Sequence, residues 1–313
     1  MSGGCAPVTG PGISRRPYSK WRPGGVFWRK RRFSRPGALN VAATERQVLE
    51  RIRNVDKRVV LIGVPTDLGA NRRGVSLGPQ AARFAGLVPA LAGLGLAVAD
   101  WGNVEVVENH PSGRLGAIAA LNGTLAEMVQ RALAQGAVPL VVGGDHSLSI
   151  GSIAGAVRGG VATGLIWFDA HGDYNSPETT PSGNIHGMAL AVAHGIGAAE
   201  LVACGGPGPK VAEENTVLIG VRDLDALEKE RLRRTRMTVF TMKDIDQTGI
   251  KEVVLRALEV AGRGGGRIHV SFDLDVLDPG EAPGVSTPVA GGLNFREAHL
   301  AMEILADHDS FGS

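Results

Sequence analysis

An apolar run that ends in three regularly spaced polar side chains is the strongest constraint in this sequence. Residues 164–168 read Gly-Leu-Ile-Trp-Phe and predict a buried strand, and Asp169, His171 and Asp173 follow it directly. Side chains two residues apart on an extended chain point to the same side, so these three are expected to converge where the strand ends. Carboxylate and imidazole together favour Mn, Zn or Fe over Ca. The alternative is that Asp and His simply end a strand and begin a loop.

Two further apolar runs end in residues of the same kind. Residues 138–142 lead through Gly-Gly-Asp to His146, and residues 268–272 lead to Asp273 and Asp275. The three runs supply four carboxylates and two imidazoles, which is too many for one tetrahedral zinc ion. Four carboxylates in one place would raise each other's pKa values, and two divalent cations would balance their charge. We therefore predict a two-metal centre that lowers the pKa of a shared water, with the ligands His146, Asp169, His171, Asp173, Asp273 and Asp275.

Strand-like and helix-like segments alternate along the chain and predict the fold class. Strands are expected at residues 58–64, 97–102, 138–142, 164–168, 217–221, 237–240 and 268–272. Helices are expected at residues 80–94, 115–135, 149–157, 250–261 and 295–306. This alternation predicts a three-layer α/β fold with a doubly wound, mostly parallel sheet and the ligands at its carboxyl edge. No linker-like break separates the ligands, so one catalytic domain is expected over residues 58–313.

The first 57 residues are expected to be a basic extension outside that domain. Residues 1–44 contain nine Arg or Lys residues and no acidic residue, which is typical of a disordered tail. An Arg-rich, acid-poor transit peptide is the main functional alternative. A further alternative is nucleic-acid binding through the basic residues with Trp21, Phe27 and Trp28.

Composition narrows the class of protein further. The net charge of +2 gives no overall indication of a nucleic-acid partner, and the two cysteines, Cys5 and Cys204, make no disulfide framework. The longest uncharged apolar run, residues 84–99, is short and interrupted by Pro89, so no membrane span is predicted. We expect a cytoplasmic protein, or an organellar one if the extension is a transit peptide. The Gly-rich segment at residues 65–78 lacks the phosphate-loop patterns.

Three motifs resemble those of the ureohydrolase family and, within it, the arginases, especially the bacterial ones. They are GGDHSLSIG at residues 143–151, DAHGDYNSPETTPSGNIHG at 169–187 and SFDLDVLDP at 271–279. The resemblance extends from about residue 58 to about residue 306. It implies hydrolysis of L-arginine to L-ornithine and urea with two Mn²⁺ ions per subunit, in a homo-oligomer that is a trimer or a hexamer.

The resemblance also implies roles for single residues. One metal would be held by His146, Asp169, Asp173 and Asp273, and the other by Asp169, His171, Asp273 and Asp275. Asp173 would stabilise the intermediate, and His186, whose ordinary pKa near 6.5 suits proton transfer, would be the proton shuttle.

At the substrate end, Asn175 and Ser182 would bind the α-carboxylate, and Asp225, with Glu228 nearby, would bind the α-amino group. The alternative for Asp225 is a surface-loop or helix-capping carboxylate. The Pro-Gly common after this Asp is replaced by Ala226-Leu227, and Ser286 stands where the family usually has Gly. The pattern SGNIHG at residues 182–187 favours an arginase over an agmatinase.

The resemblance leaves alternatives open. The family has one more strand and helix after residue 306, and that strand carries an acidic residue near the guanidinium, so the chain is expected to lack its last strand. Agmatinase or another guanidino-substrate hydrolase is the alternative within the family. An inactive truncated member that only binds metal or a partner subunit is the alternative outside catalysis.

Overall fold

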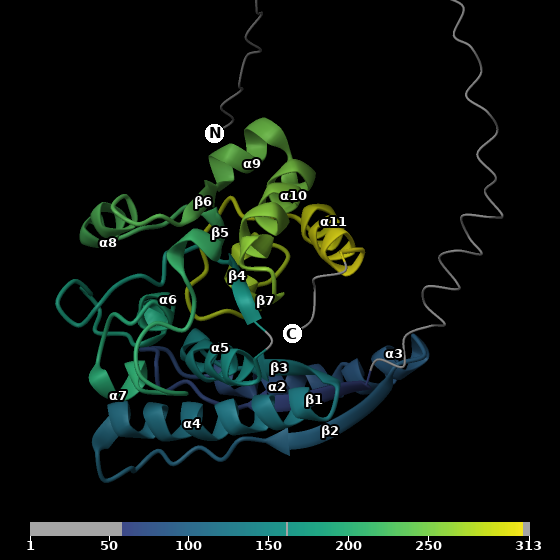
Figure 1. The fold of residues 1–313 in the computed structure, drawn as a ribbon, viewed down its shortest axis with the longest axis vertical. Coiled ribbons are helices and arrows are strands. Elements are labelled where there is room, and N and C mark those ends of the chain that lie inside the picture. The colour runs from purple at the N-terminus through teal and green to yellow at the C-terminus, as the bar shows by residue number, and fades with distance from the viewer. Residues whose placement is uncertain (1–57, 161, 309–313) are drawn as a thin grey trace, which may run out of the picture. The chain divides into compact units, whose positions relative to one another are not determined.

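Seven parallel strands form the framework of the residues that the computed structural model describes, which are 58–160 and 162–308, with residues 162 and 163 described by their backbone alone (Figure 1). The basic extension expected at residues 1–57 lies outside them. One sheet has the order β2-β1-β3, with β1 at Arg58–Val64, β2 at Ala97–Asn103 and β3 at Ala137–Gly143. The other has the order β6-β5-β4-β7, with β4 at Ala162–Phe168, β5 at Thr216–Val221, β6 at Thr238–Thr241 and β7 at Arg267–Phe272.

The strands confirm the α/β class, but their hydrogen bonds divide them into two sheets where one was expected. β3 is an edge strand of the first sheet and β7 an edge strand of the second. Side chains connect the two sheets near these edges: His146, just after β3, lies 2.8 Å from Ser271 Oγ in β7. Ser152 Oγ lies 3.1 Å from His269 Nε2. The sequence pattern could not show this division, because an apolar run fits a buried strand whichever neighbour it pairs with.

Helices pack against both sheets, although β2, at the edge of the first sheet, has no buried residue. They are α2 (Gly78–Phe84), α3 (Leu87–Gly93), α4 (Gly113–Ala134), α5 (Ser149–Arg158), α6 (Ala189–Ala193), α7 (Ala199–Val202), α8 (Ala226–Leu232), α9 (Met242–Thr248), α10 (Ile250–Ala261) and α11 (Phe295–Ala306). The helix expected at residues 80–94 is divided into α2 and α3, because Gly86 between them has the left-handed φ of +86°. The other expected helices are present, and the short helices α6 to α9 were not foreseen.

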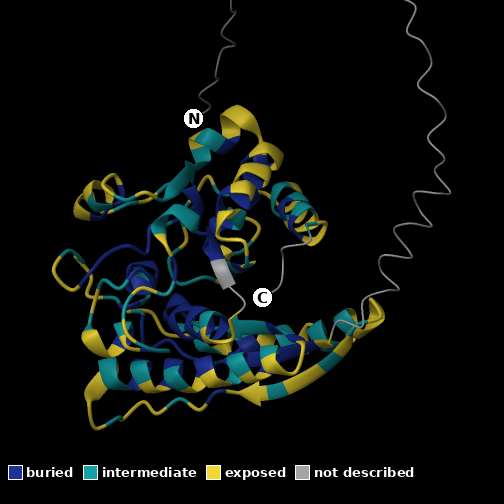
Figure 2. Ribbon diagram, viewed as in Figure 1, coloured by how far each residue is buried: buried dark blue, intermediate teal, exposed yellow. Residues whose placement is uncertain are grey.

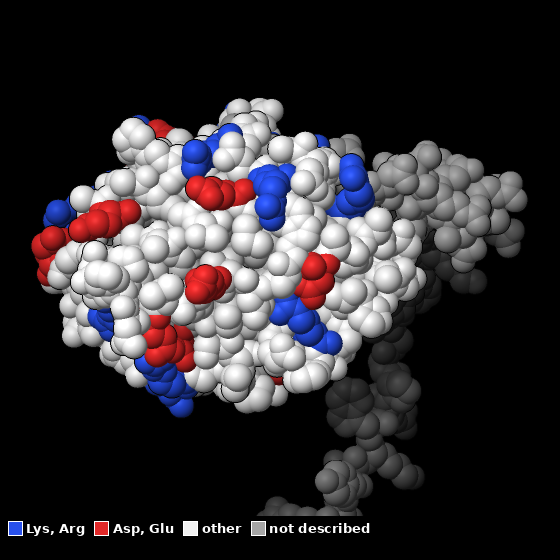
Figure 3. Space-filling view, turned by 90° about the horizontal axis from the view of Figure 1, so that it is seen from below, with Lys and Arg blue, Asp and Glu red and all other residues white. Residues whose placement is uncertain are grey.

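Burial increases toward the strands of the second sheet, and the outer faces of the helices are exposed (Figure 2). Every residue of β5 is buried, as expected for a strand covered on both faces. Helices α4 and α5 pack closely because Gly151 and Gly155 lie on the shared face. A Cβ at Gly155 would lie 2.5 Å from the carbonyl oxygen of Ala126. On the face shown in Figure 3, acidic and basic side chains are interspersed.

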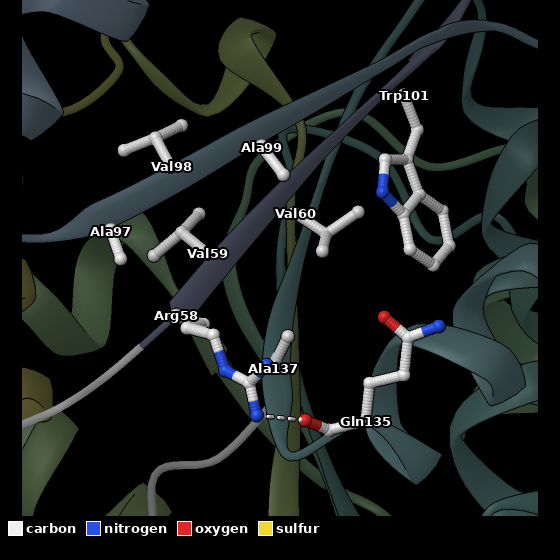
Figure 4. Close-up of a pocket in the computed structure, with 9 residues that line it drawn as sticks. All are labelled: Arg58, Val59, Val60, Ala97, Val98, Ala99, Trp101, Gln135 and Ala137. Atoms are coloured by element: carbon white, nitrogen blue, oxygen red, sulfur yellow. Dashed lines mark hydrogen bonds between the residues drawn. The ribbon is translucent and has the colours of Figure 1, made fainter.

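A pocket of about 260 Å³ opens at the amino-terminal ends of the first sheet (Figure 4). Its walls are mainly small apolar side chains, with Trp101 and with Arg58, whose guanidinium donates to the carbonyl oxygen of Gln135. The predicted ligands follow the opposite, carboxyl ends of the strands, so this pocket is not the predicted site. Within residues 58–160 and 162–308, no helix is both long and apolar enough to cross a membrane.

Candidate metal centre

The six predicted ligands all follow the carboxyl ends of three strands. His146 follows β3, whereas Asp169 and Asp273 follow β4 and β7. β4 and β7 are paired in parallel up to Phe168 and Phe272, and the backbone N–H of Asp273 donates to the carbonyl of Phe168 at 2.9 Å. This register places the two aspartates side by side.

One group of side chains gathers around His146. Its Nδ1 lies 3.0 Å from Asp169 Oδ2, 3.1 Å from Asp173 Oδ2 and 3.1 Å from Asp273 Oδ2. Potential ligand atoms of His146, Asp169 and Asp273 all lie within 4.8 Å of one another, which is close enough to share one cation. Asp173 lies beside this group through its contact with His146.

A second group gathers around His171. Its Nδ1 lies 3.3 Å from Asp169 Oδ1 and 3.1 Å from Asp275 Oδ2. Ligand atoms of these three residues also lie within 4.8 Å of one another. Asp169 therefore presents Oδ2 to the first group and Oδ1 to the second, as a carboxylate shared between two cations would.

Asx turns explain the two-residue spacing of the ligands. The carboxylate of Asp169 accepts the backbone N–H of His171 at 2.7 Å, and that of Asp273 accepts the N–H of Asp275 at 2.9 Å. Asp145 accepts the N–H of Ser147 in the same way at 3.0 Å. The first Asp of each pair thus turns the chain as soon as the strand ends.

The extended chain expected over residues 169–173 is wrong. β4 ends at Phe168, and Asp173 has a φ of +47°, the only positive φ of a non-glycine residue among those described. The side chains of Asp169, His171 and Asp173 do converge, but the turning backbone brings them together. A left-handed Asp costs about 1 kcal/mol, which the surrounding packing must offset.

Two residues that are not predicted ligands hold the side chains of the first group in place. The ring of Trp167 stacks on His146 with centroids 4.2 Å apart, and its Nε1 donates to Asp169 Oδ2 at 2.9 Å. Ser271 occupies Nε2 of His146, which leaves Nδ1 for the carboxylates. The sequence analysis missed both residues. Trp167 on β4 and Ser271 on β7 each stand two positions before the ligand that follows the strand, and this spacing could have indicated them.

Thr287 supports the second group and was also missed. Its hydroxyl donates to Asp275 Oδ2 at 3.0 Å, and the backbone N–H of Ala170 donates to Asp275 Oδ1 at 3.2 Å. Thr287 comes from the long loop after β7, which carries no periodic pattern, so only the folded structure brings it to Asp275.

The shifted pKa values of the cluster residues indicate an excess of buried negative charge. Burial disfavours a charged His171, but the carboxylates of Asp169 and Asp275 outweigh it and raise its pKa to about 11. Burial and the charge of Asp169 raise the pKa of Asp275 to about 7 and that of Asp173 well above its usual range. Asp173 Oδ2 is buried without a well-aligned hydrogen bond, although His146 Nδ1 lies 3.1 Å from it. The cluster therefore needs positive charge, and its oxygen and imidazole donors fit divalent transition-metal cations.

The residues expected to bind the substrate lie on two segments beside the cluster. Asn175 Nδ2 donates to Asp225 Oδ2 at 2.8 Å, so the structure brings these two together. Ser182 lies on an exposed turn, where its Oγ accepts the N–H of Asn184 at 3.2 Å. Asp225 is the N-cap of α8, as its alternative interpretation stated, and Ala226-Leu227 begin this helix.

Glu228 is the buried member of this group. Its Oε1 accepts the backbone N–H of Tyr174 at 2.9 Å and its Oε2 that of Asp225 at 3.3 Å. Burial raises its pKa to about 7 despite these hydrogen bonds. Glu228 thereby ties α8 to the residue that follows Asp173.

His186 begins a short 3-10 helix at His186–Met188, and its N–H donates to the carbonyl of Gly69 at 3.1 Å. Burial lowers its pKa, and the charges of Asp145 and Asp273 offset only part of this effect. The imidazole is therefore neutral at pH 7 and able to accept a proton.

Comparison with known proteins identifies the family. The Arginase family model matches residues 57–313. The chain belongs to the arginase family. An arginase from Bacillus subtilis is 46% identical over 258 residues, which cover 81% of this chain and 87% of that protein.

Among solved structures, a bacterial arginase is more similar to this chain than an agmatinase is. The arginase structure from Bacillus caldovelox is 44% identical with a TM-score of 0.78, over 82% of this chain and 89% of that one. A hypothetical agmatinase from Burkholderia thailandensis is 28% identical with a TM-score of 0.61, over 78% and 72%. This chain is thus more similar to the named arginases than to that agmatinase.

Proposed function

We propose that the chain hydrolyses L-arginine to L-ornithine and urea with two Mn²⁺ ions. The observation that carries the proposal is Asp169, whose two carboxylate oxygens face two separate histidine-containing groups. Relatives named arginase at about 45% identity support arginine as the substrate. Membership of the arginase family also supports a cytoplasmic trimer or hexamer. It supports residues 58–313 as the catalytic domain of each subunit.

The ligands of the first ion would be His146, Asp169, Asp173 and Asp273, and those of the second Asp169, His171, Asp273 and Asp275. When bound, the two ions lower the pKa of a water enough to supply the nucleophile near neutral pH. This chemistry fits the cluster, because its excess of carboxylates balances two divalent charges.

The protein side chains would then guide the reaction at the guanidinium carbon. Asp173 accepts hydrogen bonds from the tetrahedral intermediate as the new C–O bond forms. The bond from carbon to the ornithine nitrogen breaks, and His186 relays a proton to that nitrogen. A neutral His186, as its lowered pKa provides, can take up the proton that it later releases.

The amino-acid end of the substrate would be bound outside the metal cluster. Asn175 and Ser182 take the α-carboxylate, whereas Asp225 and Glu228 take the α-amino group. Contact between Asn175 and Asp225 supports this assignment, because one group of side chains then offers both a donor and a negative charge.

Urea release from L-arginine and from agmatine, after loading the chain with Mn²⁺, tests the proposal. We expect urea from L-arginine alone, and competition by L-ornithine but not by putrescine. Urea from agmatine alone would make the chain an agmatinase and contradict the assignment of Asn175, Ser182 and Asp225. Two bound Mn²⁺ without urea from either substrate would favour a non-catalytic member of the family.

A further inference from the structure

Arg222, which directly follows β5, joins three separate segments around the second group of ligands. Its guanidinium donates to the carbonyl oxygen of Asp275 at 2.6 Å and to that of Val289 at 2.7 Å. In all it reaches six backbone carbonyls, those of Gly220, Asp275, Val276, Leu277, Val289 and Ala290. The planar fork of an arginine carries five N–H donors and can serve acceptors on several sides at once.

Residues 278–292 form a loop, here called the strap, that Arg222 holds on one side. The carboxylate of Asp278 closes its base by accepting the N–H of Gly280 at 3.0 Å and that of Gly291 at 2.8 Å. Gly292 lies directly against the guanidinium, since a Cβ there would lie 2.6 Å from Arg222 Nη2. The strap is therefore fixed at its first residue, Asp278, and at its last two residues, Gly291 and Gly292.

Arg222 contacts Asp275 in two ways, once directly and once through the strap, which carries Thr287. It holds the backbone carbonyl of Asp275 directly. It also holds the part of the strap at Val289, two residues from Thr287, whose hydroxyl donates to Asp275 Oδ2. This is the oxygen that faces His171 Nδ1 at 3.1 Å.

The first group of ligands depends on other residues. His146 is held by Ser271 and by the ring of Trp167. The two positions share Asp169 and Asp273, but their other ligands are supported by different parts of the fold, so one support can weaken without the other.

We propose that Arg222 is the positioning residue of the second cation position, whose proposed ligands are Asp169, His171, Asp273 and Asp275, and leaves the first position unaffected. The proposal rests on the two-metal centre proposed above. The structure supports it through the contacts of Arg222 with Asp275 and with the strap that carries Thr287.

The test compares Mn²⁺ binding in the unaltered chain, in Arg222→Lys and in Arg83→Lys. A lysine in place of Arg222 would keep the positive charge but has only three donors for the six carbonyls. Arg83 is a matched control, because its guanidinium bonds to Asp100, Asn103 and the carbonyl of Gly102, all in β2. Metal-free protein is titrated with Mn²⁺, and free Mn²⁺ is followed by electron paramagnetic resonance.

In Arg222→Lys we expect one Mn²⁺ to bind as in the unaltered chain and the second about 10- to 100-fold more weakly. In Arg83→Lys both should bind unchanged. Amide hydrogen exchange of the metal-free protein provides a readout independent of the metal. It should be faster over residues 275–293 in Arg222→Lys and unchanged over residues 143–148.

Arg222→Met removes every donor and should enlarge both effects; if it does not fold, Arg222→Lys decides the question. Unchanged binding in Arg222→Lys, or an equal loss at both positions, would overturn the role of Arg222 and leave the two-metal centre standing. Fewer than two Mn²⁺ in the unaltered chain would instead overturn the two-metal function, and this proposal with it.

Discussion

Three aspartates, Asp145, Asp169 and Asp273, each turn the chain where a strand ends. Each accepts the backbone N–H two residues later, which aims the next polar side chain toward the cluster. The same carboxylate of Asp169 also faces both histidines. A single residue type thus does two things, because an aspartate has two oxygens and a side chain short enough to reach its own backbone.

Replacing Asp169, which both groups share, should reduce Mn²⁺ binding more than replacing His171, which belongs to one group. Asp169→Asn keeps the Asx-turn acceptor but loses the charge, so we expect neither Mn²⁺ to be retained. His171→Asn should retain one Mn²⁺, and urea release should fall by at least about 100-fold in both variants. The number of Mn²⁺ ions retained per chain after gel filtration tests the expected metal loss. Two retained ions and unchanged turnover in His171→Asn would remove His171 from the ligand set.

Buried histidines outside the cluster should make the protein acid-sensitive. Burial lowers the pKa of His269 to about 4, and likewise that of His194. An unfolded chain protonates these groups near pH 6.5, so it binds more protons than the folded chain between pH 6.5 and 4. Stability is therefore complete above pH 6.5 and falls as the pH drops toward 4, by about 3 kcal/mol for each histidine.

His269→Gln tests this, because Gln keeps a polar group near Ser152 but does not titrate. Denaturant unfolding of the metal-free protein at pH 7, 5.5 and 4 should give a shallower loss of stability in this variant. The same slope with and without His269 would contradict the prediction.

At the scale of the element, α8 is fastened to the loop that follows the ligand Asp173. Glu228 accepts the N–H of Tyr174, Asp225 accepts from Asn175, and Arg231 donates to Ser176 Oγ at 3.0 Å. The three contacts come from the N-cap and two residues of α8, so α8 sets where the loop runs. The proposed α-amino and α-carboxylate contacts depend on this alignment.

Arg231→Met should loosen α8 from the loop without touching a metal ligand. The lost hydrogen bond comes from a charged donor, so we expect a loss of about 1–2 kcal/mol in stability and a several-fold higher KM for L-arginine. Two Mn²⁺ should still bind. Arg234→Met is the control, because the side chain of Arg234 is exposed, lies just beyond α8 and pairs with Glu230 on the helix surface. Equal effects of both variants would contradict a specific role for Arg231.

At the scale of the whole molecule, the cluster lies where the two sheets meet. His146 follows the first sheet, and the other five ligands follow the second. The side chains of His146 and Ser271 connect the edge strands β3 and β7, which are not paired through backbone hydrogen bonds. Cations bound there would therefore hold the two sheets together.

Bound metal should for this reason raise the melting temperature. Each site contributes about 2.7 kcal/mol when free Mn²⁺ is 100 times its dissociation constant. For a domain of this size, two sites should raise Tm by more than about 10 °C above the chelated protein. Calorimetry measures the shift, and Ca²⁺, which prefers all-oxygen sites, is the control. An equal shift with Ca²⁺ would contradict binding at the histidine-containing cluster.

The seven strands and the six candidate ligands could be predicted from the sequence, because both depend on local chemistry. An apolar run of strand length favours a strand wherever it falls, and an Asp after such a run turns the chain through its own backbone. For this reason His146, Asp169 and Asp273 were recognisable without a structure.

Tertiary structure alone decided the contacts between distant residues. It divided the strands into two sheets, made Ala226-Leu227 the start of α8, and brought Thr287 and Arg222 to Asp275. It also decided which oxygen of Asp169 faces which imidazole. Such contacts join residues many positions apart, and their geometry is set by how the whole chain packs, which no local pattern encodes.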